Sequence, residues 1–537
     1  MNNYQVAADK PWFRFWPEGV PKTLDYPEIP LFGLLSRAAE KWPDSTAFGF
    51  GEEKLSYAEL DDLTGRLAAG LHDLGIRPRD KVLLFLTNSL DFIISYYGIL
   101  KAGATVTTVN PLSRQAELRH QLDDTGATGL ITSSEFYPIV KEVRPGTALK
   151  AVVLTDAERV KDTVFLKQIL NTYPPTPPRF TVKPEDDVAA IVYTGGTTGL
   201  PKGVLLTHLN LVANAMQNAA WFGWSHNDII IGLLPFYHSW GGCTCINSPV
   251  FSGARVIITP RFDAEELLTT IEKEKATVMY GAASMFTSLV NSPAITRHNI
   301  SSLRYVKSGA MPIPPEIRDR WQKLTGIRMA LGYGLSEASP ETHNSPLDRI
   351  KSGTIGFPAI DTDARIVDEQ TGETEMPTGQ TGELIIRGPQ VMKGYLNRPE
   401  DTSEALRNGW LYTGDLAMMD EEGYFHALDR KKETIKYKGY TIAPAEVEAT
   451  LYEHPAVREC AVIGKPDAIA GELPKAFVVL KAGQSATAEE LISFCAERIS
   501  PYKRIREVEF IDEIPKTPVG KLLRRILRDR ERGNQPQ

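Results

Sequence analysis

The sequence predicts an α/β protein that ends in a smaller α+β unit, on three observations. Over the first 180 residues, helical patterns such as 57–75 alternate with short apolar runs such as 81–86, which favours parallel strands covered by helices. From about 353 to 430 the pattern changes to short strands with glycine turns, which predicts a β-rich subdomain. The last hundred residues combine apolar strands with a helix near 487–499, which is typical of a compact α+β unit.

The individual elements follow from apolar spacing and from the residues that end each run. The pattern at 57–75 has helical spacing and ends on Gly75, a residue type that commonly follows the last turn of a helix. The proline-rich run at 173–179 predicts an extended connector. Helices are expected over 31–42, 57–75 and 89–103, and strands over 81–86, 104–109, 128–132, 187–194, 382–388, 423–430, 457–464, 476–481 and 508–512.

Composition and charge exclude several classes of protein. The chain has 537 residues, of which 42% are hydrophobic and 24% charged, values that are ordinary for a folded globular protein and not for a disordered one. Its formal net charge of −7 lacks the basic excess with which proteins hold nucleic acid by bulk charge, so no nucleic-acid partner is expected. An anionic ligand would therefore be bound by local groups and not by the overall field.

The cysteines and the apolar runs indicate a cytoplasmic protein. Four cysteines, with no second closely spaced pair, are too few for a disulfide framework or a zinc site, so they are expected to be buried thiols in a reducing compartment. The N-terminal residues lack the basic start and apolar core of a secretory signal. The most apolar stretch, 82–100, is interrupted by Thr87, Asn88 and Asp91 and falls short of a membrane span.

The strongest motif is the run YTGGTTGLPKG at 193–203, which continues the strand expected at 187–194. Glycines and threonines after a strand expose backbone N–H groups and hydroxyls that suit phosphate oxygens, and Lys202 can add a positive charge. The run differs from the P-loop of NTPases, because Lys202 is followed by Gly203 and not by Ser or Thr. A purely structural glycine turn is the alternative, which the density of Gly and Thr disfavours.

The second motif is the run GYGLSEAS at 332–339. A tyrosine between glycines, Tyr333, presents a ring face on which a purine could stack. Glu337, four residues later, could hold a magnesium ion that bridges phosphates. On its own the segment is a weak signal, because a turn that carries a solvated glutamate is the more common explanation.

The third motif is the run GWLYTGDLA at 409–417. Asp415 follows a glycine after an apolar strand, a position from which a carboxylate could bind both hydroxyls of a ribose. Arg430 stands at the end of the next pair of strands. Taken singly, each of these residues is more often a surface charge.

Two further segments carry weaker signals. Lys521 lies in a glycine-containing turn, PVGK, before an amphipathic basic helix, and a lone lysine near a C-terminus usually has no special role. His238 and Trp240 lie between a strand and a glycine pair, where a histidine is more often a core residue than a ligand.

Together and in this order, the segments YTGGTTGLPKG, GYGLSE, YTGD, DRKKETIKYKGY and PVGK resemble the adenylate-forming superfamily of acyl-CoA synthetases, firefly luciferases and peptide-synthetase adenylation domains. The resemblance extends from about residue 30 to 527 and implies a fold with a large N-terminal domain, 1–430, and a small mobile C-terminal domain, 431–537. It also implies a reaction with ATP, Mg²⁺ and coenzyme A, in which a carboxylic acid is first adenylated and then transferred to the thiol of coenzyme A.

The resemblance also assigns roles to residues at matching positions. The nucleotide and coenzyme A would contact Thr194, Gly195, Gly196, Thr197, Thr198, Lys202, Gly309, Ala310, Gly332, Tyr333, Gly334, Ser336, Asp415, Arg430, Lys438, Gly439 and Tyr440. Catalysis would depend on Lys521, Glu337 and His238, with Glu337 as the metal ligand and Lys521 between the carboxylate and the α-phosphate. The acyl pocket would include His238, Trp240, Ala283 and Met311, and Lys432 would be the hinge.

The chain departs from the family pattern at a few positions. Gly195 and Gly196 stand where many members have serines, a variant common among fatty acyl-CoA synthetases, and Ser336 replaces the usual threonine but keeps the hydroxyl. Leu331 stands where Gln or Asn is frequent, which puts one polar contact in doubt.

The acid is expected to be apolar, because the pocket segments at 281–286 and 308–312 are small and apolar and offer no Asp to pair with an amino acid's ammonium group. A medium- or long-chain fatty acid fits best. An aryl acid such as coumarate or benzoate is the main alternative, because Trp240 could either stack on a ring or block it.

Other classes and properties stay open. A luciferase-like oxidoreductase and a fatty acyl-AMP ligase that serves a carrier protein are the less favoured enzymes, and a non-catalytic regulator is disfavoured because Lys521 and Glu337 are both present. The sequence leaves the oligomeric state open, with a homodimer among the alternatives. A long-chain substrate would be compatible with peripheral contact to a membrane.

Overall fold

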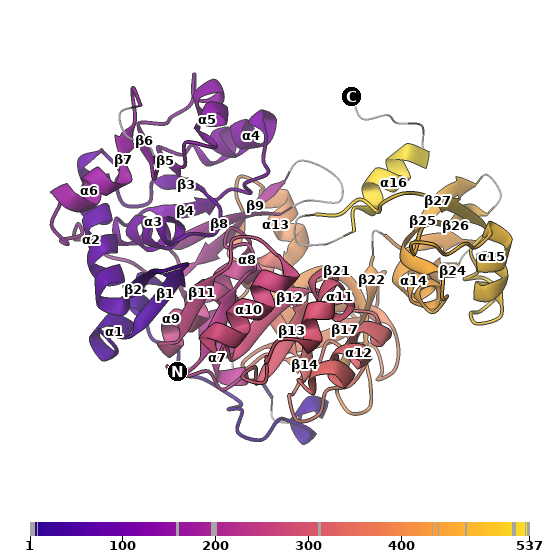
Figure 1. Ribbon diagram of the computed structural model, residues 1–537. Coiled ribbons are helices and arrows are strands. Elements are labelled where there is room, and N and C mark those ends of the chain that lie inside the picture. Colours follow the sequence, from indigo (N-terminus) through magenta and orange to yellow (C-terminus); the bar gives the residue numbers. More distant parts are fainter. Residues whose placement is uncertain are drawn as a thin grey trace.

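The structure is a computed structural model that describes residues 6–533 except 8, 157–159, 195–200, 310–312, 432, 439, 468–469, 518–521 and 532. Four sheets are found in these ranges. Figure 1 shows three of them in one large part of the molecule, and the fourth in the C-terminal part, which lies to one side in orange and yellow. The predicted α/β class is confirmed.

The first sheet has the strand order β19-β9-β8-β4-β3-β5-β6-β7. Its strands are β3 (Lys81–Phe85), β4 (Thr105–Thr108), β5 (Gly129–Thr132), β6 (Ala151–Leu154), β7 (Val164–Phe165), β8 (Val188–Thr194), β9 (Lys202–Thr207) and β19 (Gly394–Tyr395). The strands from β8 to β7 are parallel, and β9 and β19 extend the sheet in antiparallel fashion. The antiparallel pair β8–β9 therefore flanks the segment in which the sequence predicts a phosphate loop.

The second sheet has the order β16-β15-β14-β13-β12-β10-β11-β1-β2. Its strands are β1 (Thr46–Phe50), β2 (Glu53–Ser56), β10 (Ile229–Gly232), β11 (Arg255–Ile258), β12 (Val278–Ala282), β13 (Tyr305–Gly309), β14 (Met329–Gly334), β15 (Glu341–Asn344) and β16 (Phe357–Pro358). The strands from β14 to β1 are parallel, so their carboxyl ends share one edge. Gly309 and Gly334 both lie at that edge.

Helices fill the space around these two sheets. They are α1 (Phe32–Lys41), α2 (Tyr57–Asp73), α3 (Leu90–Lys101), α4 (Gln115–Thr125), α5 (Tyr137–Val143), α6 (Leu166–Thr172), α7 (His208–Trp221), α8 (Ser239–Gly241), α9 (Ser248–Ser252), α10 (Ala264–Glu274), α11 (Ala283–Asn291) and α12 (Pro315–Thr325). Helix α3 is buried except at Asp91 and contacts β3 and β4 of the first sheet and β1 of the second. The largest apolar core therefore joins both sheets. In the described ranges, no helix has the length and apolarity needed to cross a bilayer.

The third sheet confirms the predicted β-rich region. It contains β17 (Asp363–Val367), β18 (Gly382–Arg387), β20 (Leu406–Arg407), β21 (Trp410–Met419) and β22 (Phe425–Arg430), all in antiparallel pairs, with α13 (Pro399–Ala405) before β20. Asp415 of β21 lies opposite Arg430 of β22 in the pairing register. This register brings together two residues that the sequence places in separate segments.

The fourth sheet begins at Ile435 and forms the predicted C-terminal α+β unit. Its elements are β23 (Ile435–Tyr437), β24 (Tyr440–Ile442), α14 (Pro444–Tyr452), β25 (Val457–Asp467), β26 (Gly471–Leu480), α15 (Ala488–Ala496), β27 (Glu507–Phe510) and α16 (Arg524–Glu531). The helix expected near 487–499 is α15, and its first turn is closed by a capping box between Thr487 and Glu490. The four cysteines are free and buried, as the sequence predicts.

Arg524 links the end of the large part to the C-terminal unit. Its guanidinium donates to Asp429 at 3.4 Å, to Glu433 at 2.5 Å, and to Glu448 of α14 at 2.7 and 3.0 Å. All four side chains are at most one-tenth exposed. Burial raises the pKa of Asp429 to about 6, with Glu448 adding to the rise and Arg524 opposing it.

The Asp429→Asn variant tests this electrostatic arrangement. Because the pKa of Asp429 is raised in the folded state, its contribution to stability is present at low pH and is lost as the pH rises through about 6. We expect the C-terminal unit to be more stable in the asparagine variant than in the wild type at pH 8, and this difference to shrink at pH 4, where the wild-type carboxyl is itself neutral in the folded state. Hydrogen exchange of α14 amides in the full chain measures this. Equal protection of variant and wild type at pH 8 would contradict it.

Candidate active site

The expected phosphate loop connects β8 to β9. Thr194, the last residue of β8, pairs with Lys202, the first residue of β9, so these two candidates lie opposite each other. The ammonium group of Lys202 lies 2.5 Å from a carboxylate oxygen of Asp401 in α13 and 5.3 Å from the ring centre of Tyr395. Because both charges are about one-third exposed, a phosphate could replace Asp401 as the partner of Lys202. Gly195, Gly196, Thr197 and Thr198 lie outside the described residues.

Tyr333, Asp415 and Arg430, named separately from the sequence, meet in one cluster. The hydroxyl of Tyr333 donates to Asp415 at 2.5 Å, although the two residues are 82 positions apart. The Nε of Arg430 lies 3.0 Å from the other carboxylate oxygen of Asp415. The pKa of Tyr333 is raised by burial and by this carboxylate, and the pKa of Arg430 is raised by the same carboxylate. The cluster combines an aromatic ring with a carboxylate, as a nucleoside site requires.

Gly332 and Gly334 allow the backbone around Tyr333 to pack closely. A Cβ at Gly334 would lie 2.3 Å from the carbonyl oxygen of Pro340, and one at Gly332 would lie 2.5 Å from Cε of Lys307. Any side chain at Gly334 would therefore displace the backbone that carries the turn. The two glycines are explained by this packing, independently of any ligand.

Glu337 is held beside this cluster by a tyrosine that the sequence analysis did not single out. It lies in a short 3-10 helix, Ser336–Ala338, and its carboxylate accepts a hydrogen bond of 2.8 Å from the hydroxyl of Tyr395. The hydroxyl of Ser336 lies 3.0 Å from that of Ser239. Tyr395 also lies beside Lys202, so a single side chain contacts both the candidate metal ligand and the candidate phosphate-binding lysine. A carboxylate in this position suits magnesium, which prefers oxygen ligands.

The expected acyl residues gather at the edge formed by β12 and β13. His238 precedes α8, and its Nδ1 accepts a hydrogen bond from the backbone N–H of Trp240 at 3.2 Å. Trp240 is buried, and its ring packs against Gly309 at the end of β13. Ala283 begins α11 directly after β12. Ala310 and Met311 lie outside the described residues.

Two buried charges near this edge have no counterpart in the sequence analysis. Lys307 of β13 pairs with Glu341 of β15, and both side chains are less than 5% exposed. The pocket segments of the sequence contain no acidic residue that could pair with an amino acid's ammonium group. Glu341 does not supply one, because Lys307 already neutralises its charge. Neither residue belongs to a recognisable motif, so only the strand pairing brings them together.

Two of the C-terminal candidates, Lys438 and Tyr440, lie at the β23–β24 pair. Tyr437 pairs with Tyr440, and Lys438 has a φ of 48° and donates its N–H to the carbonyl of Ala470 at 2.8 Å. Tyr440 belongs to β24. Gly439, Lys432 and Lys521 lie outside the described residues.

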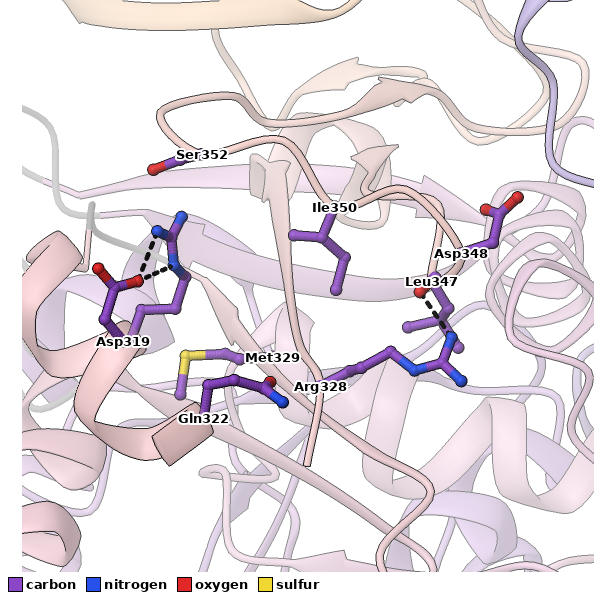
Figure 2. A pocket seen from close by; sticks show the side chains of 9 residues that line it. Asp319, Gln322, Arg328, Met329, Leu347, Asp348, Ile350 and Ser352 are labelled. Carbon is purple, nitrogen blue, oxygen red and sulfur yellow. Dashed lines mark hydrogen bonds and ion pairs between the residues drawn. The ribbon is translucent and has the colours of Figure 1, made fainter. Parts of the chain in front are cut away.

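A separate hollow of about 340 Å³ lies away from these residues. Figure 2 shows its lining, which includes Arg328, Met329 and Leu347, with the Arg328 side chain bonded to the Leu347 carbonyl. Met329 is the first residue of β14, whereas Tyr333 lies near the other end of that strand. Four residues at about 3.3 Å each place the hollow roughly 13 Å along the strand from the tyrosine. It is therefore distinct from the candidate site.

Comparisons with known proteins agree with this geometry. A family model described as AMP-binding enzyme matches residues 35–396, and one described as AMP-binding enzyme C-terminal domain matches 446–521. A long-chain-fatty-acid–CoA ligase of Bacillus subtilis is 40% identical, over 98% of this chain and 99% of its own. A 4-coumarate–CoA ligase of Narcissus pseudonarcissus is 36% identical, over 90% of each chain.

The fold agrees as well. The crystal structure of ATP-bound MatB from Rhodopseudomonas palustris superposes with a TM-score of 0.87 at 28% identity and covers 94% of this chain and 100% of its own. The match extends over both the large part and the C-terminal unit. The chain therefore belongs to the family of AMP-binding enzymes, within the adenylate-forming superfamily that its motifs resemble.

Proposed function

We propose that the protein is an ATP-dependent fatty-acid–CoA ligase that forms AMP. In the first half-reaction a carboxylate oxygen attacks the α-phosphorus of ATP, giving acyl-adenylate and pyrophosphate. In the second, the thiol of coenzyme A attacks the acyl carbon, and AMP leaves. The observation that carries the proposal is the cluster of Tyr333, Asp415 and Arg430 beside Glu337, because three separate motifs converge there as a nucleotide site requires.

The residues around this cluster supply what the first half-reaction needs. A carboxylate is a weak nucleophile toward a polyanion, so the barrier is one of charge repulsion and orientation, which fixed cations and dipoles lower. Lys202 and the 194–198 loop would bind the β- and γ-phosphates, and Lys521 would bridge the carboxylate and the α-phosphate. Glu337 would hold a magnesium ion, which neutralises phosphate charge when bound. Tyr333 would stack on the adenine, and Asp415 and Arg430 would hold the ribose.

The acid that the site accepts is proposed to be a long-chain fatty acid. The similarity to the Bacillus subtilis ligase extends over nearly the whole of both chains. The acyl edge near Gly309 and Ala283 is apolar, and its buried charges, Lys307 and Glu341, neutralise each other. A free carboxylate or ammonium group on the acyl tail would therefore find no unpaired partner among these residues. An aryl acid is the second candidate, because the 4-coumarate–CoA ligase is almost as similar.

The second half-reaction is proposed to depend on rotation of residues 431–537 about Lys432. After this rotation the turn at 438–440 would line the channel for the pantetheine arm of coenzyme A. In support, the large part ends with β22 at Arg430, and the fourth sheet begins at Ile435. The side-chain links across this boundary include Arg524 with Asp429, a contact that rotation can exchange for water.

The experiment that tests the function measures pyrophosphate release from ATP and magnesium across a panel of acids, with and without coenzyme A. Turnover that is fastest with palmitate or dodecanoate and depends on coenzyme A is expected. A single burst of pyrophosphate that coenzyme A does not change would indicate a carrier-protein acceptor instead. Turnover that is fastest with 4-coumarate or benzoate would favour the aryl alternative, and no release with any acid would overturn the assignment.

Replacing Lys521 by alanine separates the two half-reactions. We expect adenylation to fall by about a hundredfold to a thousandfold, since removal of one transition-state cation or donor typically has that effect. Conversion of a supplied acyl-adenylate to the thioester should be nearly unchanged, because Lys521 would contact the carboxylate only during adenylation. Single-turnover assays of each step measure this. Equal losses in both steps would contradict the role.

The Tyr395→Phe variant tests the support of Glu337. Loss of the hydroxyl leaves the carboxylate free to rotate, so we expect the magnesium concentration for half-maximal adenylation to rise about tenfold, while the KM for the fatty acid stays constant. Tyr412→Phe is the matched control, because that hydroxyl donates to the carbonyl of Gly372 and not to Glu337. The same magnesium dependence in both variants would show that Tyr395 does not position Glu337.

A further inference from the structure

A buried ion pair lies behind the acyl edge of the site. The ammonium group of Lys307 donates to one carboxylate oxygen of Glu341 and, at 2.5 Å, to the side-chain oxygen of Asn344. It also lies 5.2 Å from the ring centres of Phe222 and Tyr280. Burial lowers the pKa of Lys307, and the Glu341 carboxylate opposes that effect. The pair is therefore a rigid, enclosed group that belongs to neither the phosphate loop nor the ribose cluster.

The second oxygen of Glu341 binds Trp240. The indole Nε1 donates to it at 3.0 Å, and the backbone of Glu341 is itself fixed by two hydrogen bonds to the Asn214 side chain, of 2.8 and 3.1 Å. On another side, the Trp240 ring lies edge-on to Tyr280, with ring centres 6.2 Å apart. The orientation of the indole is thus determined by a charge-assisted hydrogen bond and by packing.

The ring held in this way closes the space next to Gly309. A Cβ at Gly309 would lie 3.0 Å from Cζ2 and 3.1 Å from Cη2 of Trp240, so the indole is in contact with the backbone at the end of β13. Any acyl group placed between them would need about 3.5 Å on each side, or roughly 7 Å in all, and that space is absent while the indole stays in place. An alkyl chain can bend around the indole at its methylene groups, whereas the ring of a conjugated aryl acid such as 4-coumarate must stay in line with its carboxylate.

We propose that Glu341, supported by Lys307, is a specificity-determining positioning residue: it holds Trp240 against Gly309, so that the acyl site admits a flexible alkyl chain that bends past the indole and rejects a rigid, planar aryl acid. This inference rests on the proposed function, in which the acyl group binds beside Trp240. It accounts for a charged pair in an apolar region, where ion pairs add little net stability over apolar residues of similar volume. The Glu341 carboxylate of this pair accepts the Trp240 N–H and so fixes the orientation of the indole, which apolar residues could not do.

The test compares kcat/KM for 4-coumarate with that for dodecanoate in four full-length proteins. They are the wild type, W240F, the double variant K307M/E341L and its matched control K307M/E341Q. W240F replaces the indole by a smaller phenyl ring and so removes the N–H donor. K307M/E341L removes the charges and the acceptor for the indole, whereas K307M/E341Q removes the charges but retains an amide oxygen as acceptor.

We expect the coumarate-to-dodecanoate ratio to rise about tenfold in W240F and in K307M/E341L, and to stay within about twofold of the wild type in K307M/E341Q. An equal rise in both double variants would overturn the proposal, because the hydrogen bond to Trp240 would then not be the cause. An unchanged ratio in W240F would also overturn the proposal. Because W240F keeps a buried aromatic ring at this position, it tests the proposal even if a double variant folds poorly.

The assays distinguish a wrong proposed function from a wrong role of Glu341. If wild-type protein releases no pyrophosphate with dodecanoate, the proposed function is wrong. If it is active with dodecanoate and W240F shows the wild-type ratio, only the inference about Trp240 and Glu341 is wrong. The KM for ATP, measured in the same assays, should stay constant, since Glu341 acts on the acyl side and a general loss of structure would change both constants.

Discussion

The Asp415 carboxylate is the group on which the arrangement of the site depends. It is buried, and a buried carboxylate is stable only with charged or hydrogen-bonding partners. Its partners come from different sheets: Tyr333 from the parallel second sheet, and Arg430 from the antiparallel third sheet. The hydrogen bond and the ion pair of this one carboxylate therefore hold the edge of one sheet against the other, and the candidate nucleotide site lies where the two sheets meet.

The same strand that completes this cluster also leads to the C-terminal unit. Arg430 binds Asp415, and the preceding residue, Asp429, binds Arg524 of α16. Neighbouring residues on a strand point to opposite faces, so one position faces the candidate nucleotide site and the next faces the C-terminal helix. A movement of the C-terminal unit would therefore act on a strand end that also holds Asp415 and Arg430, the pair proposed to bind the ribose. This gives a physical route by which nucleotide binding and domain position can depend on each other.

The candidate nucleotide residues could be predicted from the sequence because their motifs are local and contain glycines, as around Tyr333. Tyr395, Lys307 and Glu341 could not. Each of them contacts a partner that is distant in sequence: Glu337 for Tyr395, Glu341 for Lys307, and Trp240 for Glu341. No periodicity or local motif encodes such a contact, because it arises only when the strands pair. The division of the α/β region into two sheets joined by α3 was likewise not readable from alternating elements alone.

Both the charge and the shape of the proposed acyl edge favour an uncharged, flexible acyl chain. The apolar composition of its segments already indicated an acid without a second charge. The structure adds two charges, Lys307 and Glu341, but they neutralise each other and are enclosed by Asn344 and by aromatic rings, so neither is available to a substrate. The effect of the ion pair is on orientation: Glu341 accepts the indole N–H of Trp240 and so holds the ring against the backbone of Gly309. A flexible chain without polar groups satisfies both constraints, because it can bend past the indole. A dicarboxylate fails the first constraint, and a rigid aromatic acid fails the second.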